Sequence, residues 1–292
     1  MNKIKLVAKV TDDLSVQDKK EKGADSGEWQ IFKDNFHFTR YDFPITSVHT
    51  SLDGGDVCID ECFLCGAQTI EKMKETRRKL EEAFQFAEEI AKKQGHRITI
   101  VAHSEQSAYP AERSAIIAYL QTLFKKYPNC DLALENTCIL ENPTNGKYAV
   151  RSGIKPADVP KTVCYLRNIM KEVQLEHRIF TVLDVCHALC TIRCTNLLLK
   201  GITEVQDETV LLEEYFKQTA PYCKIIHFNY LENLGFASGH GTPFPDSVIG
   251  KVLALYETYI PTADLVIEIR EDDYSDSKNF QNTVNQINQY FE

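Results

Sequence analysis

Short apolar segments rich in β-branched residues recur along the chain, and each is followed by a longer stretch with helical periodicity. Continuously apolar runs of this kind are typical of parallel strands that are buried on both faces. The strands expected from this pattern are Ile4 to Val10, Ile45 to His49, Ile98 to His103, Leu132 to Glu135, Ile179 to Asp184, Ile225 to Phe228 and Leu265 to Ile269.

The intervening stretches predict amphipathic helices. The clearest runs from about Ile70 to Gln94, with Phe84, Ala87 and Ile90 on one face, and Gly95 is a typical C-terminal stop. The other expected helices are Ala111 to Lys126, Pro160 to Val173, Glu208 to Gln218, Ser247 to Tyr259 and Ser277 to Tyr290.

Strands that alternate with helices in this way predict an α/β fold, and we expect a (β/α)₈ TIM barrel with its site at the C-terminal ends of the strands. The chain has 292 residues, close to the roughly 250 of a typical barrel, so we expect residues 1–292 to form one barrel domain. We expect the eighth strand between Trp29 and Asp42. The alternative is a doubly wound open sheet, but no GxGxxG loop follows the first apolar run, as a dinucleotide-binding sheet would show.

Polar residues close almost every apolar run, at or just beyond its last position. A charged residue at the end of a buried strand is costly unless it is paired, hydrogen-bonded or bound to a metal. In a barrel all these ends open onto one face, so residues far apart in sequence meet there. They are His49, His103, Glu135, Asp184, His187, His227, His240 and Glu268.

Mixed imidazole and carboxylate donors suit Zn²⁺ or Mn²⁺, and Co²⁺ or Fe²⁺ as further choices. We therefore expect a divalent-metal site at this face. His37, His96 and His177 lie outside the pattern, and we interpret them as solvated loop residues.

Composition and charge limit the kinds of partner that the chain can bind. No apolar run approaches the ~20 residues that cross a bilayer, and the N-terminus has no signal-peptide pattern. The formal net charge of -9 gives no basic footprint for nucleic acid or an anionic membrane. We expect a cytoplasmic protein without a membrane partner.

Ten cysteines in such a chain indicate reduced thiols rather than a disulfide framework. Cys58, Cys62 and Cys65 lack the second CxxC pair of a zinc ribbon, so we do not expect structural zinc there. Cys186, Cys190 and Cys194 form one stripe if helical and are expected to be buried as small apolar residues.

The strand-end segments resemble the xylose-isomerase-like TIM barrel superfamily. This superfamily contains sugar isomerases, ketose 3-epimerases and endonuclease-IV-type (family 2) AP endonucleases. The resemblance spans nearly the whole chain in order. The segments that carry it are Leu134-Glu135-Asn136, Leu183-Asp184-Val185-Cys186-His187, Ile226-His227-Phe228-Asn229, Gly239-His240-Gly241 and Ile267-Glu268.

The isomerase and epimerase branch implies one divalent ion held by Glu135, Asp184, His227 and Glu268. In that branch the ion stabilises an enediolate while two glutamates, here Glu135 and Glu268, move the proton. His187 would bind a substrate oxygen. The substrate would be a small sugar or sugar phosphate. One departure is that no arginine follows His227 closely, where the epimerases carry a substrate-binding one.

The AP endonuclease branch implies three zinc ions that hydrolyse a phosphodiester at abasic DNA. His49, His103, His187 and His240 would be additional ligands there. The ninth ligand of that branch, an aspartate, is Ser238 here, which removes a negative charge from the third ion. The loop after His49, Thr50 to Asp56, is acidic rather than suited to phosphate.

We therefore favour the isomerase or epimerase, with the AP endonuclease as the alternative and DNA as a partner only in that case. A third alternative is a barrel that binds metal or sugar without catalysis. The pair Glu135 and Glu268 argues against it, because ligand binding alone needs no paired bases.

Overall fold

The computed structural model describes residues 4–32, 35–51, 57–63, 69–104, 111–142, 147–149, 153–200, 207–233, 239–273 and 276–292. Eight strands form a closed barrel in the order β1-β12-β9-β8-β5-β4-β3-β2, and every neighbouring pair is parallel. They are β1 (Leu6–Val10), β2 (Ser26–Gln30), β3 (Ile45–His49), β4 (Ile98–Ser104), β5 (Cys130–Asn136), β8 (Ile179–Asp184), β9 (Cys223–Phe228) and β12 (Asp264–Ile267). The predicted α/β barrel is confirmed.

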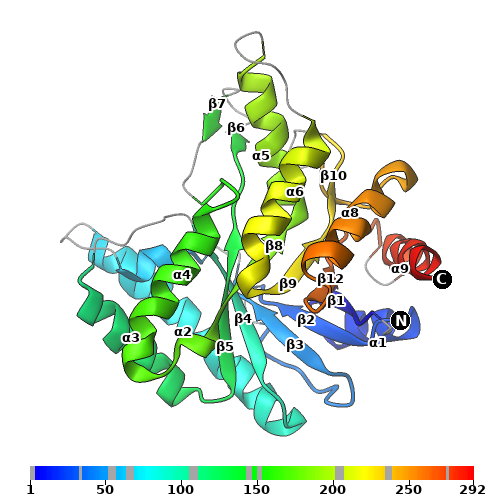
Figure 1. The fold of residues 1–292 in the computed structure, drawn as a ribbon. Coiled ribbons are helices and arrows are strands. Elements are labelled where there is room, and N and C mark those ends of the chain that lie inside the picture. Colours follow the sequence, from blue (N-terminus) through cyan, green and yellow to red (C-terminus); the bar gives the residue numbers. More distant parts are fainter. Residues whose placement is uncertain are drawn as a thin grey trace.

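The α-helices lie around the outside of these strands (Figure 1). They are α1 (Asp13–Glu21), α2 (Ile70–Gln94), α3 (Arg113–Lys126), α4 (Asp158–Met170), α5 (Val185–Leu198), α6 (Glu208–Thr219), α8 (Asp246–Tyr259) and α9 (Lys278–Phe291). Short 3₁₀ turns span Ile59–Phe63, Lys171–Val173, Glu176–Arg178 and Ala220–Tyr222. Two small hairpins pair β6 (Leu140–Asn142) with β7 (Lys147–Ala149) and β10 (Tyr230–Leu231) with β11 (His240–Thr242). None of the described helices combines the length and apolar character needed to span a bilayer.

All seven predicted strands and all six predicted helices are present, with small shifts at their ends. The predicted position of the eighth strand is wrong, because β2 begins at Ser26 and only its last two residues fall in the expected interval. Its five residues are all buried although three of them, Ser26, Glu28 and Gln30, are polar. This composition hid the strand from a search for apolar runs.

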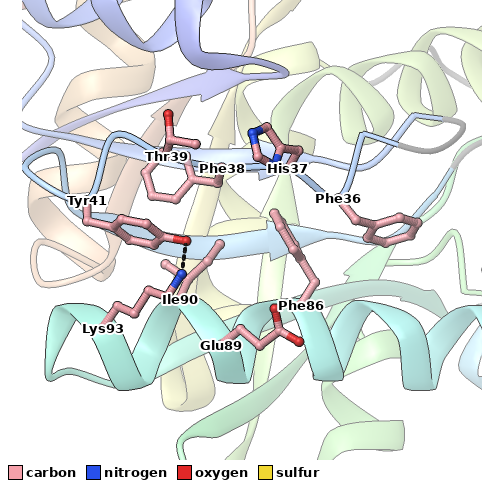
Figure 2. Close-up of a pocket in the computed structure, with 9 residues that line it drawn as sticks. All are labelled: Phe36, His37, Phe38, Thr39, Tyr41, Phe86, Glu89, Ile90 and Lys93. Carbon is pink, nitrogen blue, oxygen red and sulfur yellow. Dashed lines mark hydrogen bonds between the residues drawn. The ribbon is translucent and has the colours of Figure 1, made fainter.

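The strict alternation of strand and helix fails at two connections. Between β8 and β9 the chain forms two helices, α5 and α6, while the described residues between β2 and β3 contain no helix. The β2–β3 segment instead packs aromatic side chains against β2 and α2: Phe38 lies against Trp29 of β2, and Phe36 lies against Phe86 of α2. A pocket of about 210 Å³ lies between this segment and α2 (Figure 2), and its lining includes no strand-end residue of the barrel.

Two apolar layers support the barrel. The larger lies between strands and helices, and the smaller is a plug of six buried residues from six strands. These six are Val7, Val101, Ala133, Val182, Ile225 and Val266. Two positions later on the same strands, or directly beyond them, stand Lys9, His103, Glu135, Asp184, His227 and Glu268. Because side chains two apart share a face of a strand, the same inward faces that form the plug carry a polar layer above it.

Candidate metal centre

Glu135, near the end of β5, is the centre of this polar layer. Its Oε2 lies 3.0 Å from His49 Nε2 and 3.6 Å from His103 Nε2. Its Oε1 lies 3.2 Å from His227 Nδ1 and 3.4 Å from His187 Nδ1. One fully buried carboxylate therefore faces imidazoles from four different parts of the chain.

His227, on β9, is in turn surrounded by carboxylates. Its Nδ1 lies 3.1 Å from Glu268 Oε2, 3.2 Å from Glu135 Oε1 and 3.7 Å from Asp184 Oδ2. The strand register brings Asp184 directly beside His227. A single ring nitrogen carries at most one proton, so it cannot satisfy three carboxylates by donating hydrogen bonds.

Asp184 is held in place by backbone and amide donors. It is the N-cap of α5, and its Oδ1 accepts a hydrogen bond of 2.6 Å from the His187 backbone N–H. Its Oδ2 accepts one of 3.0 Å from Asn229 Nδ2. The capping interaction fixes the carboxylate and also starts the helical turn that carries His187 back over Glu135.

Two charged residues of the site were not recognised in the sequence. Glu28 of β2 is fully buried, with Oε1 3.0 Å from His227 Nε2 and Oε2 2.8 Å from the Ser47 hydroxyl, which donates to it. Lys9 Nζ of β1 lies 2.9 Å from Glu268 Oε1 and 3.3 Å from Glu28 Oε1. The signal that points to Lys9 is its spacing of two from the plug residue Val7, the spacing that separates Val101 from His103.

The pKa values follow from this mixture of charges. Burial opposes ionisation of Glu28, Glu135, Asp184 and Glu268, but the facing imidazoles and Lys9 outweigh it and lower the pKa of each carboxyl. Burial likewise disfavours a charged His227, yet Glu28 and Glu135 raise the pKa of its imidazole well above the usual value. For His187, Asp184 and Glu135 overcome burial and raise the pKa. The polar layer therefore holds its carboxyl groups in the ionised form, and these carboxylates need positive charge beside them.

A divalent ion fits this donor set. The layer contains four carboxylates but only one lysine. The positive charge that balances the other carboxylates must come from protonated imidazoles or from a bound cation. A proton on His227 Nε2 would be stabilised by Glu28, which leaves the Nδ1 lone pair for an ion. The groups whose donor atoms lie within 4.8 Å of one another include His49–Glu135–His227, His103–Glu135–His187 and Asp184–His227–Glu268.

The other residues named from the sequence differ in how close they lie to the polar layer. His240, on β11, stands with its ring centroid 5.2 Å from that of His187. Ser238 and Cys65 lie outside the described residues, as does most of the loop from Thr50 to Asp56. Of the three other histidines, His37 and His177 are exposed as expected, whereas His96 is half-buried and its Nε2 lies 2.9 Å from the Ile45 carbonyl oxygen.

The cysteine expectations can also be compared with the structure. None of the nine described cysteines forms a disulfide, and Cys58, Cys62, Cys186, Cys190 and Cys194 are buried. The last three lie on α5, so the condition under which they were expected to form one stripe, a helix at this segment, is met. Packing alone does not describe Cys186, however, because its sulfur lies beside donor atoms of Asp184 and His240.

Known proteins offer similar barrels at low sequence identity. No protein-family model matches the sequence, and no curated protein matches it. Among solved structures, an AP endonuclease, family 2, from Brucella melitensis is 12% identical with a TM-score of 0.46, covering 94% of this chain and 96% of that one. A sugar phosphate isomerase/epimerase from Parabacteroides distasonis is 12% identical with a TM-score of 0.42, covering 100% and 97%.

A thermostable chitinase domain from Pyrococcus furiosus is 8% identical with a TM-score of 0.44, covering 100% of this chain and 98% of that domain. These neighbours thus include an AP endonuclease, a sugar phosphate isomerase/epimerase and a chitinase.

Proposed function

We propose that the chain is a divalent-metal-dependent sugar isomerase or epimerase. The observation that carries the proposal is the convergence of Glu135, Asp184 and Glu268 on one nitrogen of His227, at 3.1 to 3.7 Å. When bound there, Mn²⁺ or Zn²⁺ would act as a Lewis acid that polarises a carbonyl and its neighbouring hydroxyl.

Glu268 is the proton-transfer group that substrate reaches first. Its side chain is 23% exposed, whereas those of Glu135 and Asp184 are almost fully buried. Burial opposes its ionisation, but Lys9, at 2.9 Å, lowers the pKa of its carboxyl and so keeps it ionised, the form that can accept a proton. In the proposed reaction Glu268 removes a carbon-bound proton next to the carbonyl, and the electron pair moves toward the carbonyl oxygen. Return of a proton to the adjacent carbon, while the neighbouring hydroxyl passes its proton to the former carbonyl oxygen and becomes the new carbonyl, isomerises the sugar. Return of a proton to the opposite face of the same carbon epimerises it.

Glu135 is the second proton-transfer group in this proposal. Four imidazoles face it at 3.0 to 3.6 Å and, when protonated, could exchange protons with it. His187, three residues beyond Asp184, would bind a substrate oxygen and orient the reacting carbon. A small polar sugar suits a layer in which nearly every group is a donor or acceptor, and the net charge of -9 gives no support to a nucleic-acid partner.

One observation favours a second candidate, a metal-dependent phosphodiesterase of the AP endonuclease type. The two oxygens of Glu135 face different histidine pairs, Oε2 toward His49 and His103 and Oε1 toward His187 and His227. This is the arrangement of a carboxylate shared by two ions, and such sites activate water for hydrolysis.

Proton exchange in D₂O tests the first candidate. Metal-reconstituted protein is incubated with a panel of ketoses and ketose phosphates, and NMR follows loss of carbon-bound protons. We expect exchange with at least one of these sugars. Glu268→Gln should abolish it, while Glu232→Gln, a matched change at an exposed carboxylate, should leave it intact.

Elemental analysis of untagged protein and an abasic-duplex assay separate the alternatives. Three tightly bound zinc ions together with nicking that disappears in Asp184→Asn would overturn the isomerase in favour of the phosphodiesterase. Protein that contains no divalent metal, and regains none on dialysis, would exclude both reactions, and tight sugar binding by that protein would indicate the non-catalytic alternative.

A further inference from the structure

Cys186 stands at the edge of the polar layer, as the second residue of α5. Its Sγ, a carboxylate oxygen of Asp184 and a ring nitrogen of His240 all lie within 4.8 Å of one another. Asp184 comes from the end of β8 and His240 from β11, so three separate elements bring the three donor types to one point. Zinc sites combine these ligand types at about 2.0 to 2.3 Å from the ion.

The surroundings of the Cys186 sulfur suit a thiolate better than an apolar group. The backbone N–H of Gly241 donates a hydrogen bond toward it. Gly241 has φ +76°, a conformation that side chains disfavour, and a Cβ there would lie 3.3 Å from Arg270 Cγ. Glycine thus allows the chain after His240 to turn its amide toward the sulfur. Amide donors that face a ligating atom are typical of the outer shell of metal sites.

Cys190 provides the contrast within the same helix. It is equally buried, but its thiol donates to the backbone carbonyl of Ile139 at 3.2 Å, an ordinary partner within the fold. Cys186 instead has the Asp184 carboxylate beside it. A thiol offers that carboxylate only a weak S–H donor, whereas a cation between them would bind both groups.

His240 supplies the nitrogen donor of this group from β11. Its ring centroid lies 5.2 Å from that of His187, so its imidazole borders the polar layer as well as the Cys186 sulfur.

We propose that Asp184, Cys186 and His240 bind a second divalent ion beside the first, with Asp184 shared between the two and Cys186 as a thiolate ligand. On binding, the S–H bond breaks, its proton passes to solvent and a sulfur–metal bond forms, without any change of oxidation state. A thiolate prefers zinc or cobalt to the harder manganese or magnesium ions. The inference rests on the proposed metal-dependent function through Asp184 alone.

Cobalt titration of chelator-stripped full-length protein tests this inference. Co²⁺ bound by a thiolate gives a sulfur-to-cobalt charge-transfer band in the near ultraviolet, and inductively coupled plasma mass spectrometry counts the bound ions. We expect the wild type to show the band and to bind one equivalent more Co²⁺ than Mn²⁺. Cys186→Ala should lose the band and one equivalent of cobalt, while Cys190→Ala should keep both.

The outcomes distinguish this inference from the proposed function. Cobalt that binds without a thiolate band, or a band that survives in Cys186→Ala, overturns the thiolate site and leaves the first metal site standing. Protein that binds no cobalt at all overturns both. Cys186→Ser keeps the size of the side chain and serves in the same comparison if the alanine variant does not fold.

Discussion

Replacement of Glu28 by glutamine should weaken metal binding, although Glu28 is not itself one of the proposed ligands. Its carboxylate lies 3.0 Å from His227 Nε2 and 3.3 Å from Lys9 Nζ, and its side chain is fully buried. Glutamine keeps the shape but removes the charge, so the proton on His227 Nε2 loses its stabilising partner. Nδ1 then no longer presents its lone pair as strongly to an ion.

The magnitude can be worked from this geometry. Loss of an outer partner of a metal-binding histidine costs about 10- to 100-fold in metal affinity, or about 1.4 to 2.7 kcal/mol. We expect the upper part of this range, because no solvent screens Glu28 and Lys9 is left with Glu268 alone. Ser47→Ala is the matched control, since it removes the hydrogen bond that the Ser47 hydroxyl donates to Glu28 at 2.8 Å and preserves the charge of Glu28. It should change metal affinity less than about threefold, even if it costs about 1.5–3 kcal/mol of stability, as the loss of a hydrogen bond to a charged group does.

The assay is competition for Zn²⁺ between chelator-stripped protein and a chromophoric chelator at neutral pH, with circular dichroism to verify that each variant is folded. Wild-type affinity in a folded Glu28→Gln variant would refute the reasoning. An equal loss in Ser47→Ala would also refute it, because the effect would then follow from disturbed packing rather than from charge.

Three further predictions concern stability, each measured by urea unfolding. Asp131→Asn should lower the free energy of unfolding by about 3–5 kcal/mol, because the guanidinium of the buried Arg178, which lies 3.2 Å from Asp131, loses its counter-charge. Lys224→Met removes a partly exposed partner of Asp131 and should lower it by about 1 kcal/mol or less. Similar values for the two variants would contradict this. Burial would lower the pKa values of His227 and His187, but the facing carboxylates raise both. The stability that these two protonated histidines give the metal-free protein is therefore complete below about pH 6.5, and it is lost as pH rises through their raised pKa values. Zinc should remove this alkaline loss, and an identical pH profile with and without zinc would argue against the site. Gly27→Ala should destabilise the barrel by about 1–3 kcal/mol, because its Cβ would meet three buried side-chain atoms at 2.9 to 3.1 Å, and an unchanged urea midpoint would show that the wall can relax there.

Most of the barrel could be predicted from the sequence because seven of its strands have apolar residues on both faces. The exception, β2, carries Ser26, Glu28 and Gln30 among its five buried residues, so burial there follows from charge pairing rather than from hydrophobicity. The first helix, α1, was missed for a related reason. Only Ser15, Val16 and Lys19 of its residues are buried, which leaves too little apolar periodicity to detect.

Helix α5 escaped detection for the opposite reason. It is buried over most of its length, so apolar residues occupy nearly all its faces and no stripe stands out. The residues of the site were recognised or missed for the same reasons as the elements that carry them. Residues that close apolar runs, such as Glu135 and Asp184, could be identified, whereas Lys9 within a run and Glu28 in an unrecognised strand could not.

We expect Asp184, His227 and Glu268, together with Glu135, to surround a divalent cation. Anomalous diffraction from crystals grown with Zn²⁺ or Mn²⁺ would locate this ion among the side chains. The anomalous peak should lie about 2.0–2.2 Å from His227 Nδ1 and from a carboxylate oxygen of Asp184. Crystals that show no peak at this position, with the carboxylates neutralised only by Lys9 and by protonated imidazoles, would contradict it.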